Sequence, residues 1–201
     1  WLQKEKQLSD RTVNHCISQL RFFTMYVLHR PWDPTQLPMR RFDTYLPYVP
    51  FQKEVWDFIQ SFSTLKHKAV ISLMYSSGLR VREVCALRYE DIDISRSSMR
   101  IHICHSKARS DRYAILSQKA LDILTQYWFR AGKPRGFLFP NRNDPQRPMA
   151  AYTVNQFIFA KETELGLEHR FTCHTFRHAF GTHLYKNGTD LLTIKALLGH
   201  K

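Results

Sequence analysis

The chain has 201 residues, and 43% of them are hydrophobic, which is enough for a folded core and excludes a wholly disordered chain. No apolar run approaches the ~18 residues of a membrane span, and no basic segment followed by an apolar stretch marks a signal peptide. Thirty lysines and arginines oppose seventeen acidic residues, and the net charge of +13 predicts a polyanionic partner such as DNA, RNA or an acidic membrane surface. The chain starts at Trp1, and we expect it to be part of a longer cytoplasmic protein.

Residues 96–147 concentrate the positive charge, with eleven basic and three acidic residues. Apolar residues are interleaved throughout this stretch, so we interpret it as a folded contact surface. The four cysteines form no C-x-x-C pair, and we expect reduced thiols in or near the core. Neither the cysteines nor the ten histidines show the spacing of paired zinc ligands, and we expect no metal.

Residues 10–29 carry apolar side chains at helical spacing, with Ser9 or Asp10 as the N-cap, and predict one amphipathic helix. Five prolines between residues 31 and 50 exclude a long helix there and indicate a linker. The same periodicity predicts later helices over residues 53–62, 65–77, 81–87, 117–130, 152–164 and 172–186, and a last one that Thr189 or Asp190 caps and that ends at Leu198.

Met99, Ile101 and Ile103 alternate with polar neighbours and predict a half-buried strand. Residues 112–116 can return as its antiparallel partner, which makes residues 105–111 the tip of a hairpin. The predicted fold is therefore mainly α with a small antiparallel β-sheet, in the α+β class.

Three short motifs carry side chains suited to phosphate chemistry. Arg80 begins a helix in a Gly-Leu-Arg turn with Glu83 one turn on, although the two could form an ordinary ion pair. His174 and Arg177 share one face of a helix. The pair is suited to phosphate chemistry, with the arginine as a clamp and the histidine as a proton carrier, but it could also be the exposed polar side of an ordinary helix. His200 follows a helix-ending glycine, which is a weak signal by itself.

Taken together and in this order, the motifs resemble the tyrosine recombinase/integrase family over roughly residues 50–201. The family pattern is filled by Gly78-Leu79-Arg80 with Glu83, Lys107 on the hairpin, His174 with Arg177, and Leu198-Gly199-His200. The resemblance implies a catalytic domain over residues 51–201 and a linker over 36–50. Residues 1–35 then resemble the last part of a small N-terminal helical DNA-binding domain.

The resemblance also implies roles for these residues in breaking a phosphodiester. Arg80 and Arg177 would grip the two non-bridging oxygens, and His200 would add a third donor. His174 is the candidate base that takes the proton of the attacking hydroxyl. Glu83 would support Arg80 rather than act as a catalyst.

Lys107 is the candidate acid that protonates the leaving 5′-oxygen, or else one more contact to the DNA backbone. The family often has glycines around this lysine, whereas here it lies in His105-Ser106-Lys107-Ala108-Arg109. Arg109 or Arg112 would take its place if the hairpin register differs. The arginines supply the charge that a metal supplies elsewhere, so no cofactor is expected. The predicted DNA-contact residues are Arg82, Arg109, Arg112, Arg142 and Arg147.

One departure from the family is large, because the nucleophilic tyrosine of the family follows L-G-H and the sequence ends at Lys201. Tyr185 reads as a packing residue and does not fit the role. We therefore expect this chain to bind double-stranded DNA as a monomer without cleaving it, while the full-length protein acts as a tetramer on its recombination site.

The leading hypothesis is a site-specific DNA recombinase from a mobile genetic element, working in the bacterial cytoplasm or nucleoid. The alternative is a non-catalytic DNA-binding protein on the same fold. A third reading, an RNA-binding module, rests on charge and aromatic content alone, because no RNP signature is present. Under all three readings the affinity should fall steeply with salt, because phosphate contacts release counterions.

Overall fold

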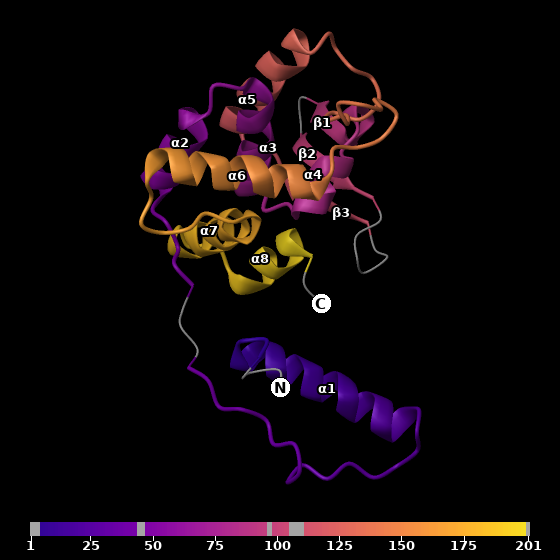
Figure 1. The fold of residues 1–201 in the computed structure, drawn as a ribbon. Helices are drawn as coiled ribbons and strands as arrows, with labels where there is room; N and C mark the ends of the chain where they lie inside the picture. Colours follow the sequence, from indigo (N-terminus) through magenta and orange to yellow (C-terminus); the bar gives the residue numbers. More distant parts are fainter. Residues whose placement is uncertain (1–4, 44–46, 96–97, 105–110, 200–201) are drawn as a thin grey trace. The chain divides into compact units, whose positions relative to one another are not determined.

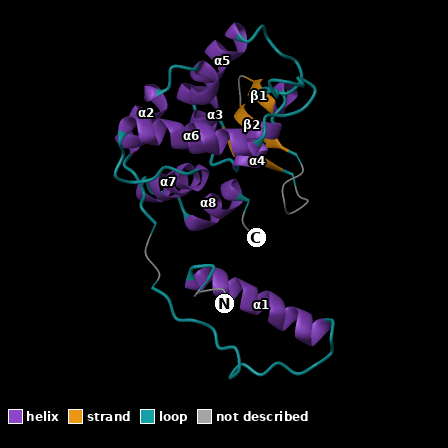
Figure 2. Ribbon diagram, viewed as in Figure 1, coloured by secondary structure: helices purple, strands orange, loops and turns teal. Residues whose placement is uncertain are grey.

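A computed structural model describes residues 5–43, 47–95, 98–104 and 111–199. The chain divides into two compact units, residues 1–47 and residues 48–201, and the division falls inside the proline-rich stretch. Figures 1 and 2 show the elements, which are α1 (Asp10–Tyr26), α2 (Gln52–Ser61), α3 (Leu65–Ser76), α4 (Val81–Ala86), the 3-10 turn η1 (Tyr89–Asp91), β1 (Ile92–Ser95), β2 (Ser98–Ile103), β3 (Arg112–Ile115), α5 (Gln118–Arg130), α6 (Ala151–Leu165), α7 (Cys173–Lys186) and α8 (Leu191–Leu198).

The first unit is built on α1, which starts where the Ser9 side chain accepts a hydrogen bond from the Thr12 backbone N–H. The helix ends at Tyr26, three residues before the predicted end. Asn14 is buried on it and exchanges two hydrogen bonds with the backbone of Arg40, at 2.8 and 2.7 Å. These bonds tie the extended segment back onto the helix.

Helix α3 lies at the centre of the second unit. Residues 69–75 are all buried, and a helix that is apolar on every side needs neighbours on every side. Helices α2, α4, α5 and α7 supply them, as the contacts of α3 record. This packing brings α4 and α7 to the same central helix, although about 90 residues separate them in the sequence.

A three-stranded antiparallel sheet in the order β1-β2-β3 confirms the predicted hairpin pair and adds a strand. Ile101 and Ile103 are buried, whereas Arg100 and His102 lie on the other face. The sequence did not predict β1, because four residues with two isoleucines are too short a pattern to stand out. The predicted hairpin tip spans residues 105–111, and all of it except Asp111 lies outside the described residues.

Side-chain caps set the starts of three later helices. Ser117 is a predicted cap and Asp190 one of two predicted candidates, whereas Thr172 was expected to be the first residue of its helix. Ser117, Thr172 and Asp190 each accept a hydrogen bond from the backbone N–H three residues on, at 3.3, 3.1 and 2.9 Å. Left-handed Gly199 ends α8. The motifs at the start of α7 and at the end of α8 therefore occupy defined helix termini.

The cysteines depart from the expectation at one position. All four are free thiols, and Cys85 and Cys173 are buried, but Cys104 is exposed. Cys104 follows the outward-facing positions Arg100 and His102 at intervals of two, so the strand alternation places it outside the core. Among the described helices, none combines the length and apolarity that a bilayer span requires.

A buried hydrogen-bond chain fixes the entry to the second unit. The Tyr75 hydroxyl lies 2.9 Å from Nδ1 of His183, whose Nε2 lies 3.0 Å from the Pro50 carbonyl oxygen. The carbonyl only accepts, so Nε2 carries the proton and Nδ1 accepts from the tyrosine. Burial, helped by the charge of Lys186 and opposed by the bond to Pro50, lowers the pKa of His183 below 6.5.

This lowered pKa predicts a loss of stability in mild acid. As the pH falls below about 6.5, the unfolded chain binds a proton that the folded His183 resists, so the free energy of unfolding decreases. The free energy of unfolding, measured with urea at a series of pH values, should decrease less steeply with falling pH in His183→Gln than in the parent. Some slope should remain, because burial also lowers the pKa of His67. The exposed His15→Gln variant is the control, and a His183→Gln slope equal to that of the control would contradict the assignment.

Candidate active site

Arg80 occupies the turn between α3 and α4. Gly78 has a φ of +61°, which lets the chain reverse direction, and Leu79 is fully buried. The Arg80 backbone N–H donates to Oε2 of Glu83 at 2.8 Å, and its Nη1 donates to Oε1 at 2.8 Å. One carboxylate thus caps the helix and orients the guanidinium, whose side chain remains 30% exposed.

Arg112, at the start of β3, holds the same carboxylate from the other side. Its Nη1 and Nη2 donate to the two oxygens of Glu83 at 2.9 and 2.7 Å, and its Nε donates to the Leu197 carbonyl at 3.2 Å. Burial raises the pKa of Glu83, but the bonds from Arg112 and Arg80 outweigh it, and the net pKa lies below the ordinary value. The carboxyl group is therefore ionised at neutral pH.

The position of Arg112 does not support the DNA contact expected from the sequence. Its side chain is only 10% exposed, and its guanidinium is engaged by Glu83 and by the end of α8. The charge density of residues 96–147 could not show this, because the partner lies 29 residues earlier in the chain.

Arg177 is buried on α7 and joins two further parts of the site. Its Nη1 donates to the Gly78 carbonyl and its Nη2 to the Leu198 carbonyl. Burial, with the charge of Arg80 nearby, lowers its pKa to about 10, so it remains a cation at neutral pH. Arg177 therefore does not belong to an exposed polar helix face, which was the alternative interpretation of this motif.

His174 lies one turn before Arg177 and is exposed. Together with Arg80 and Arg177 it lines two adjoining hollows. The α7–α8 hollow is also lined by His178, Gly181, Thr182, Tyr185, Leu191, Ile194 and Leu198. The α4–β2 hollow is also lined by Val81, Arg82, Glu83, Ala86, Leu87, Arg88, Glu90, Asp91, His102, Ile103, Cys104, Phe137 and Cys173.

The charges at this place favour an anion. The charges of Arg80 and Arg112 act on the guanidinium of Arg177, and all three interact with the carboxylate of Glu83, so positive charge is in excess among these four side chains. Preorganised cationic donors beside a hollow are suited to bind a phosphate and to stabilise added negative charge on it.

Other predicted site residues fall into two groups. Lys107, Arg109 and His200 lie outside the described residues. Cys104, which comes just before residues 105–110, lines the α4–β2 hollow, and Gly199, which comes just before His200, lies near Arg112. The predicted DNA contacts Arg82, Arg142 and Arg147 are exposed, and Arg147 pairs with Asp144 at 3.2 Å.

Tyr185 also differs from its expectation. It was predicted to be a packing residue, but it is 59% exposed and lines the α7–α8 hollow. It lies in the last turn of α7, one residue before the helix ends.

Comparisons with known proteins identify a matching family and similar chains. Residues 52–201 match the phage integrase family. The integrase/recombinase y4eF of Sinorhizobium fredii (strain NBRC 101917 / NGR234) is 36% identical over 100% of the chain and 79% of its own length. The tyrosine recombinase XerC of Bacillus licheniformis is 30% identical over 98% of the chain and 68% of its own length.

Solved structures share the fold. The crystal structure of XerA recombinase has a TM-score of 0.69 at 23% identity and covers 99% of this chain and 70% of that one. The Tn1549 transposon integrase in complex with circular intermediate DNA has a TM-score of 0.72 at 20% identity, with coverages of 99% and 74%.

Proposed function

The chain belongs to the phage integrase family of tyrosine recombinases, and from this premise we propose that the protein is a site-specific DNA recombinase that works through a 3′-phosphotyrosyl intermediate. The observation that carries the proposal is the joint lining of one hollow by Arg80, His174 and Arg177. Three residues from two distant motifs converge there, beside a carboxylate that fixes the first arginine.

In this proposal each residue has a role in the transfer of a DNA strand. Arg80 and Arg177 stabilise the extra negative charge of the pentacoordinate phosphorus, and His200 adds a donor. Exposed His174 takes the proton of the attacking hydroxyl, and Lys107 gives one to the leaving 5′-oxygen. Glu83 holds Arg80 in place. No cofactor is needed for these steps.

The nucleophile in this proposal is a tyrosine that follows His200 in the natural protein, as the family pattern implies. We further propose a mobile-element origin, a bacterial cytoplasmic or nucleoid location, and a tetramer on double-stranded DNA, with this chain alone as a monomer. The similarity to a Sinorhizobium integrase/recombinase and to a transposon integrase supports the origin.

Trapping the covalent intermediate tests the proposal. The complete natural protein is incubated with labelled, nicked DNA from the ends of its own genetic element and analysed on a denaturing gel. We expect a protein–DNA adduct that disappears when the tyrosine after His200 is replaced by phenylalanine. Tyr185→Phe is the matched control and should keep the adduct, because the residue lines the hollow without fitting the motif. Salt-sensitive binding with no adduct would favour the non-catalytic DNA-binding alternative.

Arg80 provides a sharper test than Arg177, because replacing buried Arg177 would also disturb the fold. Arg80→Ala is expected to slow adduct formation by about 10²–10³-fold while DNA affinity changes little. The control is Arg82→Ala, which lies two residues further on in α4 and is exposed. This variant should bind DNA more weakly, and the slope of log affinity against log salt concentration should fall by about 1. Its cleavage rate at saturating protein should be normal. Equal cleavage rates in the two variants would contradict the role of Arg80.

A further inference from the structure

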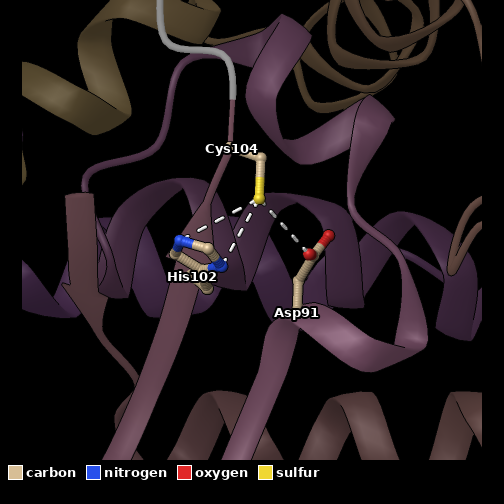
Figure 3. A group of neighbouring side chains, drawn as sticks. All are labelled: Asp91, His102 and Cys104. Atoms are coloured by element: carbon tan, nitrogen blue, oxygen red, sulfur yellow. Dashed lines mark hydrogen bonds between the residues drawn. The ribbon is translucent and has the colours of Figure 1, made fainter. Parts of the chain in front are cut away.

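Three metal-binding side chains converge at the rim of the α4–β2 hollow (Figure 3). Asp91 ends η1, His102 lies on β2, and Cys104 follows β2 directly. One oxygen, nitrogen or sulfur atom from each lies within 4.8 Å of the others. The group is separate from the arginines and His174, although it opens into the same hollow.

The sheet register explains why they meet. Ile92 pairs with Ile101, so Asp91, one residue before, lies beside His102, one residue after. His102 and Cys104 are two residues apart and share the face opposite the buried isoleucines. Oδ2 of Asp91 accepts the Arg88 backbone N–H at 2.7 Å, and Oδ1 is the oxygen nearest the sulfur. Both strand pairing and the η1 turn therefore preorganise the group.

The distances suit a tetrahedral ion. Zinc bonds of about 2.3 Å to sulfur and about 2.0 Å to nitrogen or oxygen imply ligand separations of roughly 3.5 Å. Cys104 Sγ lies 3.4 Å from His102 Nδ1 and 4.0 Å from Asp91 Oδ1. The first separation already fits, and the second needs a closure of about half an ångström. The ligand atoms of Asp91 and His102 lie within 4.8 Å of each other and must close to a similar separation, which rotation of these partly exposed side chains can supply.

A second layer of contacts orients the histidine. Its Nε2 lies 3.6 Å from Oδ2 of Asp111, and its ring stacks on Tyr113 with centroids 5.0 Å apart. A ligating histidine that directs its other ring nitrogen to a carboxylate is the usual arrangement around protein-bound zinc. Nδ1 is then the ligand, and Nε2 faces the carboxylate of Asp111.

The local charge favours a cation, in contrast to the rest of this basic chain. The carboxylates of Asp91, Asp111 and Glu90 all act on the Cys104 thiol. A divalent ion would neutralise this concentration of negative charge, and a thiolate would complete the ligand set.

We propose that Asp91, His102 and Cys104 bind a zinc ion, with the fourth position left to water. On binding, the Cys104 thiol loses its proton to solvent and the thiolate coordinates the metal. The spacing of the cysteines and histidines does not predict this site, because the fold brings Asp91 beside the strand. The ion would link η1 to the end of β2, just before the segment that contains Lys107.

Cobalt substitution tests the site without reference to DNA cleavage. Titration of the metal-free chain with Co²⁺ should give a thiolate-to-cobalt charge-transfer band and four-coordinate d–d bands that saturate at one equivalent, and Zn²⁺ should displace them. Cys104→Ser and His102→Gln should abolish the charge-transfer band and the four-coordinate spectrum respectively. Cys16→Ser, which removes a free thiol from the first unit, should leave both intact.

The variant Asp111→Asn distinguishes a loss of metal binding from a loss of folding. Asp111→Asn keeps all three ligands and should weaken Zn²⁺ affinity by about 10–100-fold in a chelator competition. Circular dichroism confirms that each variant is folded. The proposal is overturned if the parent chain shows no charge-transfer band, or if the band survives in Cys104→Ser.

Discussion

Glu83→Ala is expected to lower the free energy of unfolding by about 3 kcal/mol, measured by denaturant unfolding. The Glu83 side chain is 9% exposed and accepts hydrogen bonds from both Arg80 and Arg112. Removing it leaves two guanidinium groups facing each other, and that of Arg112 is almost fully shielded from water. The loss of a buried partner costs far more than the loss of a surface pair.

A surface pair of similar length gives the control. Asp57 contacts Lys53 at 2.8 Å, and the two side chains are 64% and 86% exposed, so Asp57→Ala should cost less than about 1 kcal/mol. The lowered pKa of Glu83 adds a pH signature, because its stabilisation is present above the ordinary value of 4.5 and is lost as the pH falls below it. The difference in the free energy of unfolding between the parent and Glu83→Ala should therefore become smaller as the pH falls below 4.5. Equal costs for the two variants at neutral pH would contradict the central role of Glu83.

Gly78→Ala should destabilise the chain by about 2–5 kcal/mol. A left-handed φ of +61° costs a non-glycine residue about 1–2 kcal/mol. The new Cβ would also overlap a ring carbon of Phe180, which is buried in α7, and such overpacking typically costs about 1–3 kcal/mol. Because the Gly78 carbonyl accepts from Arg177, the shift would also loosen the site.

Gly166 separates the two contributions. Its φ is +60°, but an added Cβ there meets nothing within 4 Å. Gly166→Ala should therefore show only the backbone cost of about 1–2 kcal/mol. Thermal or denaturant unfolding of the two variants compares them directly. If both lose the same stability, Phe180 does not restrict the turn.

The sequence predicts those parts of the fold that depend on residues close together in the chain. Side-chain caps such as Ser117 and Asp190 sit next to the helices they start, so their signal is contained in a few residues. The engagement of Arg112 by Glu83 and Leu197 depends on contacts across 29 and 85 residues, and no spacing rule reaches so far.

The exposure of Cys104 was predictable in principle. The alternation that placed Ile101 and Ile103 inside already assigned Cys104 to the outer face, but the general tendency of cysteine to be buried was given more weight. The motif residues Arg80 and Arg177 could be grouped because a family pattern links them. That Arg177 is buried against two carbonyls follows only from the packing of α7 on α3.

The all-round burial of α3 has a consequence for how the protein is made. Helix α7, which covers one side of it, is encoded about a hundred residues later. At ribosomal speeds of roughly 5–20 residues per second, the apolar surface of α3 waits about 5–20 s for that partner. During this interval the nascent chain presents residues 69–75 to solvent and to other chains. We therefore expect the unfinished second unit to benefit from chaperone protection until α7 has been made.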